Sequence, residues 1–64
     1  MTAQHFAEVI DTVQMTTGAT YIKIAEALKV GPETLRRWRR SGVPSTKVRT
    51  TRHRLRVFFS ESLG

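Results

Sequence analysis

The chain has 64 residues and a net charge of +6, and it contains two histidines and no cysteine. This length allows one domain, residues 1–64, whose core is marginal because a chain this short buries only about 60% of its unfolded surface. The lack of cysteine excludes disulfides and thiolate metal sites, and two histidines without other ligands do not make a structural zinc site. No metal and no cofactor is therefore expected, and oligomerisation is the remaining source of extra stability.

The hydropathy of the chain predicts no membrane partner. No stretch approaches the roughly 20 consecutive apolar residues that a membrane span requires. The first residues, Met-Thr-Ala-Gln-His, lack the basic region and the apolar run of a secretory signal. A cysteine-free chain with neither feature is expected in the cytoplasm.

The positive charge is concentrated in the second half of the chain. Residues 1–31 contain two lysines and three acidic residues, whereas residues 32–64 contain nine basic and two acidic residues. Eight of those nine basic residues are arginines, whose planar guanidinium matches the geometry of phosphate and of the guanine edge. Such one-sided charge indicates a nucleic-acid partner, and the alternatives are a solvated basic surface or a patch for anionic lipid.

Glycine and proline divide the chain into four segments of helical length. The first segment, about 3–16, is followed by Gly18, which suits a left-handed helix cap. The second, about 21–29, follows Thr20, whose hydroxyl can accept a hydrogen bond from an early backbone N–H. Their apolar stripes are Phe6, Val9, Ile10 and Val13 in the first, and Tyr21, Ile24, Ala25 and Leu28 in the second.

The third and fourth segments complete the prediction of an all-α, four-helix domain. The third, 32–41, has proline at its first helical position and a glycine before it as N-cap. The fourth, about 46–61, follows Ser45 as a capping residue. Residues 54–60 also fit a strand, but a helix is favoured because no other segment offers a partner strand.

The run YIKIAEALKVGPETLRRWRR, residues 21–40, carries the functional prediction. It resembles the helix-turn-helix of the Cro/repressor-type DNA-binding family of phages and plasmids. The resemblance implies that Ala25 allows close packing of two helices, which Val30, Leu35 and Trp38 lock together. One departure is Lys29, which stands where the family usually has glycine, since a left-handed lysine costs roughly 1–2 kcal/mol.

The resemblance also implies that helix 32–41 enters the major groove of double-stranded DNA. Arg36 and Arg37 are the expected guanine readers, and Glu33 either accepts from a cytosine amino group or orients Arg37. Arg39 and Arg40 are expected to clamp phosphates. The full predicted DNA-binding set is Glu33, Thr34, Arg36, Arg37, Arg39, Arg40, Lys47, Arg49 and Arg52.

The predicted function is a sequence-specific transcriptional regulator, a repressor of the Cro type. The alternatives are an excisionase-like or architectural DNA-binding factor, the DNA-binding piece of a transposase, or an adaptor for an acidic protein. An enzyme is not expected, because no nucleophile–base pair and no phosphate-binding loop is present. A homodimer is expected, because the C-terminal segment carries more large apolar residues than one small core holds, namely Val57, Phe58, Phe59 and Leu63.

Overall fold

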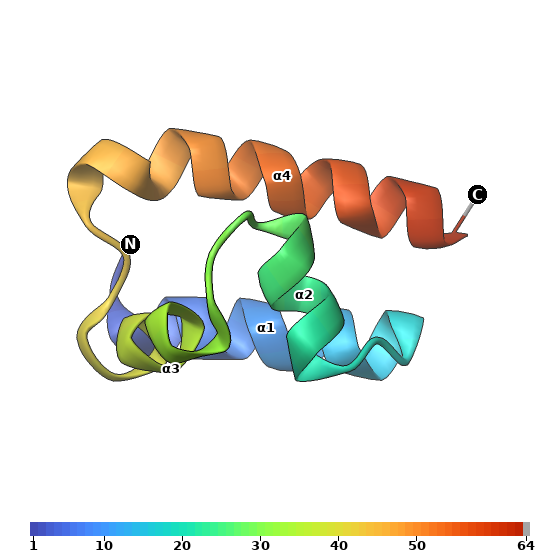
Figure 1. Ribbon diagram of the computed structural model, residues 1–64, viewed down its shortest axis with the longest axis horizontal. Coiled ribbons are helices and arrows are strands. Elements are labelled where there is room, and N and C mark those ends of the chain that lie inside the picture. The colour runs from blue at the N-terminus through green and yellow to red at the C-terminus, as the bar shows by residue number, and fades with distance from the viewer. Residues whose placement is uncertain (64) are drawn as a thin grey trace.

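The computed structural model describes residues 1–63, which form four helices and no strand. In Figure 1, α4 runs along one side of the molecule and α1 along the other, with α2 between them and α3 beside α1. The expected all-α four-helix fold is therefore confirmed, and residues 54–60 are helical. The helices are α1 (Ala3–Thr17), α2 (Tyr21–Ala27), α3 (Pro32–Ser41) and α4 (Ser45–Leu63).

Local capping groups set the limits of the helices. The Thr20 hydroxyl accepts a 3.2 Å hydrogen bond from the backbone N–H of Lys23, as predicted for the start of α2. Gly18 adopts a left-handed φ of 71° and ends α1, also as predicted. The prediction for Ser45 was wrong by one position, because Ser45 is the first residue of α4 and not its cap.

The connection between α2 and α3 is a left-handed turn at Lys29, with φ of 61°. The backbone N–H of Val30 bonds to the Ala25 carbonyl at 3.0 Å, and that of Lys29 bonds to the Glu26 carbonyl at 3.1 Å. This pair of bonds is the Schellman arrangement that ends many helices, with Lys29 at the position usually held by glycine. Lysine thus adopts the glycine-like conformation, and α2 ends at Ala27, two residues earlier than predicted.

The core is built by the inner faces of all four helices. Phe6, Ile24 and Leu35 are completely buried, and Ala25, whose small side chain allows neighbouring elements to approach closely, is 1% exposed. Trp38 is 7% exposed and meets Phe6 edge-to-face, with ring centroids 6.0 Å apart. The predicted inward positions of Ala25, Leu35 and Trp38 are therefore confirmed.

Two long-range hydrogen bonds connect distant segments of the chain around this small core. The backbone N–H of Val43, in the α3–α4 connection, donates a 3.2 Å bond to the carbonyl of Met1. The guanidinium of Arg54 in α4 donates a 3.0 Å bond to the carbonyl of Leu28, at the end of α2. Both contacts limit the movement of α3 and α4 relative to the first two helices. Within residues 1–63, no helix has the length and the apolar character needed to cross a membrane.

Candidate nucleic-acid interface

The outward face of α3 carries a row of charged side chains, and the inner face of the helix packs in the core. Leu35 and Trp38 bury the inner face of the helix, so the opposite side faces solvent. The exposed charged residues of this face are Glu33, Arg36, Arg37 and Arg40. Their shared exposure agrees with the helical period, which places these positions opposite the two core residues.

The arginines on the outward face of α3 form no ion pair with residues 1–63. The single ion pair among residues 1–63 joins Arg39 to Asp11, so it leaves Arg36, Arg37 and Arg40 without a carboxylate partner. Glu33 lies in the first turn of α3, where its negative charge interacts favourably with the helix dipole. Three free guanidinium groups on one helix face form a surface that can bind anions.

Arg39 lies on a different side of α3. Its Nη2 atom is 3.1 Å from Oδ1 of Asp11, and its guanidinium carbon is 5.8 Å from the centre of the Tyr21 ring. These contacts direct Arg39 toward α1 and α2, away from the outward face. The structure therefore separates Arg39 from the other predicted DNA-binding residues of α3 and favours a packing role for it.

The basic residues of α4 lie along two opposite edges of the helix. Lys47 borders a cleft that it shares with Thr34 of α3, so these two predicted residues are brought together. Arg49 and Arg52 border a separate hollow along α4, beside His53 and Arg56. The helical period places the edge of Arg49 and Arg52 away from that of Lys47, so these two arginines do not join the α3 face.

The cleft beside Lys47 also includes residues outside the predicted set. Lys29 reaches it from the α2–α3 turn, and Arg54 reaches it from α4. The sequence analysis identified Lys29 only as a strained turn residue. A basic residue in place of glycine at such a turn could have marked it as a candidate anion-binding residue. Thr46, Thr50 and Thr51 line the same cleft.

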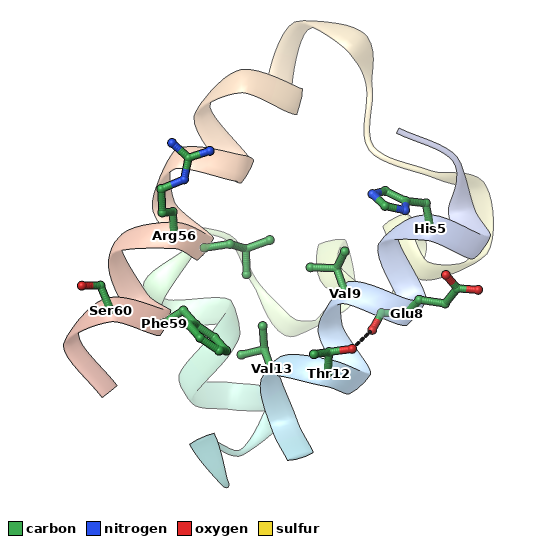
Figure 2. A pocket seen from close by; sticks show the side chains of 9 residues that line it. His5, Glu8, Val9, Thr12, Val13, Arg56, Phe59 and Ser60 are labelled. Atoms are coloured by element: carbon green, nitrogen blue, oxygen red, sulfur yellow. Dashed lines mark hydrogen bonds between the residues drawn. The ribbon is translucent and has the colours of Figure 1, made fainter. Parts of the chain in front are cut away.

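A second, apolar groove lies between α1 and α4. Figure 2 shows Val9 and Val13 of α1 facing Phe59 of α4 across it. His5 and Glu8 lie on the α1 side of its opening, and Arg56 and Ser60 lie on the α4 side. Of the C-terminal apolar residues predicted to be in surplus, Phe58 and Phe59 pack partly on the core, whereas Val57 and Leu63 are exposed.

Comparisons with known proteins add no family assignment. No protein-family model matches the chain, and no curated protein and no solved structure matches it. Among residues 1–63, no group of three histidine, aspartate or glutamate side chains is placed to hold a metal ion. The basic surfaces of α3 and α4 are thus the features from which a function can be inferred.

Proposed function

We propose that this chain binds double-stranded DNA, with α3 lying in the major groove. The observation that carries the proposal is the outward face of α3, where Arg36, Arg37 and Arg40 are exposed and unpaired while Leu35 and Trp38 hold the helix in the core. The major groove is wide enough for an α-helix, and guanine presents there two acceptors that fit a guanidinium. Because Leu35 and Trp38 anchor α3 in the core, the helix can present these groups in a fixed orientation.

The residues of α3 divide by position. Arg36 and Arg37, near the middle of the helix, are proposed to contact base edges, and Glu33 in the first turn accepts from a cytosine amino group or orients Arg37. Arg40, in the last turn, is proposed to contact phosphate. The resulting protein is a sequence-specific regulator of transcription, a repressor of the Cro type, that acts by occupying its site in the cytoplasm without a cofactor or catalysis.

The proposed regulator acts as a homodimer on a two-fold symmetric site. Support comes from apolar surface that the single chain leaves open, namely the groove between α1 and α4 and the exposed side chains of Val57 and Leu63. The groove carries Glu8 on one side of its opening and Arg56 on the other, so a second copy related by two-fold symmetry has complementary charges to offer. Two chains per operator, measured by sedimentation of the complex, is the expected stoichiometry.

The second candidate is an architectural or excisionase-like factor, which binds DNA to bend it. An excisionase-type winged helix needs a β-hairpin after the recognition helix, and residues 42–63 contain a helix and no strand. This observation favours the regulator. The DNA-binding piece of a transposase uses the same face of α3 and differs only in having a catalytic domain attached to it.

The test is a selection of bound duplexes from a random pool, followed by titration of the selected duplex and an unrelated one at two salt concentrations. A regulator is expected to select one sequence and to bind it about 10³-fold or more tightly than the unrelated duplex. Tight, salt-sensitive binding without sequence preference would instead support the architectural factor. An adaptor for an acidic protein would show no affinity for either duplex beyond weak non-specific binding.

A further inference from the structure

A polar cleft separates the α2–α3 turn and α3 from the first half of α4. Its cavity volume is about 440 Å³, and Trp38 contributes to its lining. Three basic residues and four threonines line it, and no acidic residue does. We call it the threonine cleft, and its polar lining residues are Lys29, Thr34, Thr46, Lys47, Thr50, Thr51 and Arg54.

We propose that the threonine cleft binds one phosphate group of the DNA backbone beside the major groove. The inference rests on the proposed function, because it takes the DNA strand next to α3 as the source of the phosphate. It adds a site to that function, centred on Lys29 and Lys47, that differs from the base-reading face of α3. Phosphate contacts of this kind fix the orientation of a recognition helix without reading sequence.

The charge of the cleft favours an anion. Lys29 and Lys47 are exposed, and both border the cleft from opposite elements, the turn and α4. Arg54 is half-buried, and its hydrogen bond to the Leu28 carbonyl fixes its guanidinium at the same cleft. Three positive charges around one cleft repel one another, and the attraction of each to an anion bound between them offsets that repulsion.

The threonine hydroxyls of the cleft are free to bind an external group. Of the five threonines outside the cleft, Thr16 makes no side-chain hydrogen bond, and the hydroxyls of the other four bond within the chain, namely Thr2, Thr12, Thr17 and Thr20. The four threonines of the cleft make none with residues 1–63, although one of them, Thr51, is only 4% exposed. Thr46 and Thr50 are exposed, and among residues 1–63 the Tyr21 hydroxyl is the one buried side-chain oxygen or nitrogen without a partner, so the hydroxyls of the cleft are accessible to solvent. They can therefore donate to an external acceptor.

The backbone of Lys29 is strained at the position where its side chain reaches the cleft. It is the one non-glycine residue with positive φ among residues 1–63, whereas Gly18 serves the corresponding position at the end of α1. A left-handed lysine costs roughly 1–2 kcal/mol, a cost that glycine avoids. Backbone strain of this kind persists at functional positions, and here the strained residue lines the cleft.

The test uses the full chain and the duplex selected above, with affinity measured across a range of salt concentrations. In Lys29→Gln and Lys47→Gln, binding is expected to weaken severalfold, and the slope of log affinity against log salt is expected to fall by about 1. The matched control is Lys23→Gln, since Lys23 is an exposed lysine of α2 that does not line the cleft. It is expected to keep the wild-type slope.

A fourth variant separates binding from folding. Lys29→Gly removes the ammonium group and also the left-handed strain, so its melting temperature is expected to equal or exceed that of the wild type while its DNA affinity falls. A weaker affinity caused by a damaged turn would instead come with a lower melting temperature, and that result would overturn the inference. Wild-type affinity and salt slope in both Lys29→Gln and Lys47→Gln would overturn it as well.

The outcomes also separate this site from the proposed function. Binding that depends on Arg36 and Arg37 but not on Lys29 or Lys47 keeps the proposed function and rejects the cleft. Binding that depends on the two lysines but not on the two arginines keeps the cleft and rejects α3 as the base reader. A wild-type chain without affinity for any duplex rejects both.

Discussion

The guanidinium of Arg54 donates a 3.0 Å hydrogen bond to the backbone carbonyl of Leu28, a residue 26 positions earlier in the chain. Leu28 caps α2 and is 1% exposed, so its carbonyl lies at the end of a short helix at the edge of the core. This one contact connects the long C-terminal helix to the turn that precedes α3. It therefore stabilises the position of α3 without touching that helix.

Replacement of Arg54 by methionine is expected to lower the free energy of unfolding by about 1–2 kcal/mol, because the Leu28 carbonyl loses a charged donor. Urea denaturation provides the measurement. Arg49→Met is the matched control, since Arg49 is exposed on the same helix and is expected to change stability by about 0.5 kcal/mol or less. Equal urea midpoints for the two variants would contradict the structural role of Arg54.

Alanine at Arg36 or at Arg37 is expected to weaken binding to the selected duplex by about 1–3 kcal/mol, because a bidentate contact to guanine is lost. Binding to an unrelated duplex is expected to change far less. Arg52→Ala, on the separate edge of α4, is expected to affect both duplexes equally and weakly. The assignment of base readers fails if the first two variants lose affinity for both duplexes to the same extent as Arg52→Ala.

Trp38→Ala is expected to destabilise the domain by about 3–5 kcal/mol, because it leaves a cavity against Phe6 in a small core. Such a loss is a large part of the stability of a small domain, so partial or complete unfolding at room temperature is expected by circular dichroism. Ile22→Ala serves as the control, since Ile22 is 60% exposed. A well-folded Trp38→Ala protein would be incompatible with the packing of Trp38 in this core.

Alanine substitution at the two glycines with positive φ, Gly18 and Gly42, is expected to lower stability by different amounts. At Gly18 an added Cβ has nothing within 4 Å, so Gly18→Ala carries only the conformational cost, about 1–2 kcal/mol. At Gly42 the same atom comes 2.7 Å from the carbonyl oxygen of Met1, and this clash adds to a larger conformational cost, because φ of 92° with ψ of 165° is essentially restricted to glycine. Gly42→Ala is expected to have a lower melting temperature than Gly18→Ala. The reverse order would refute the close approach of the N-terminus to the α3–α4 connection.

Tyr21→Phe is expected to raise the stability of the domain by up to about 1 kcal/mol, because an unsatisfied buried polar group is removed. The Tyr21 hydroxyl is buried and has no hydrogen-bond partner within residues 1–63, so its removal ends a desolvation cost. The ring and its contact with Arg39 remain in the variant. A drop in the melting temperature of Tyr21→Phe would show that the hydroxyl has a partner, such as a bound water molecule.

Short-range rules were sufficient to predict the four helices of this fold. Thr20, Gly18 and the Gly31-Pro32 pair act within one helical turn of their own positions, and the structure shows each at the predicted end of a helix. The choice of a helix over a strand for residues 54–60 rested on the lack of a partner strand, and that choice was correct. Helical periodicity also identified the exposed charged face of α3, because the outward positions of the helix follow directly from its two core residues, Leu35 and Trp38.

These short-range rules could not predict contacts between segments that are distant in the sequence. The pairing of Arg39 with Asp11 joins two helices, and no spacing within either helix indicates it. Arg49 and Arg52 belong to the predicted DNA-binding set, but they line a separate hollow along α4 that includes no residue of α3. Lys29 and Lys47 approach one cleft only because Arg54 and the core fix α4 against the turn.

The burial of Trp38 also determines how this protein can be observed. It is the only tryptophan of the chain, and it is 7% exposed on the core side of α3. Its fluorescence therefore comes from an apolar environment in the folded protein and shifts to longer wavelength when the core opens. The emission colour of one side chain thus reports whether a variant is folded before any DNA is added, so every affinity measurement can be accompanied by an optical check on the same sample.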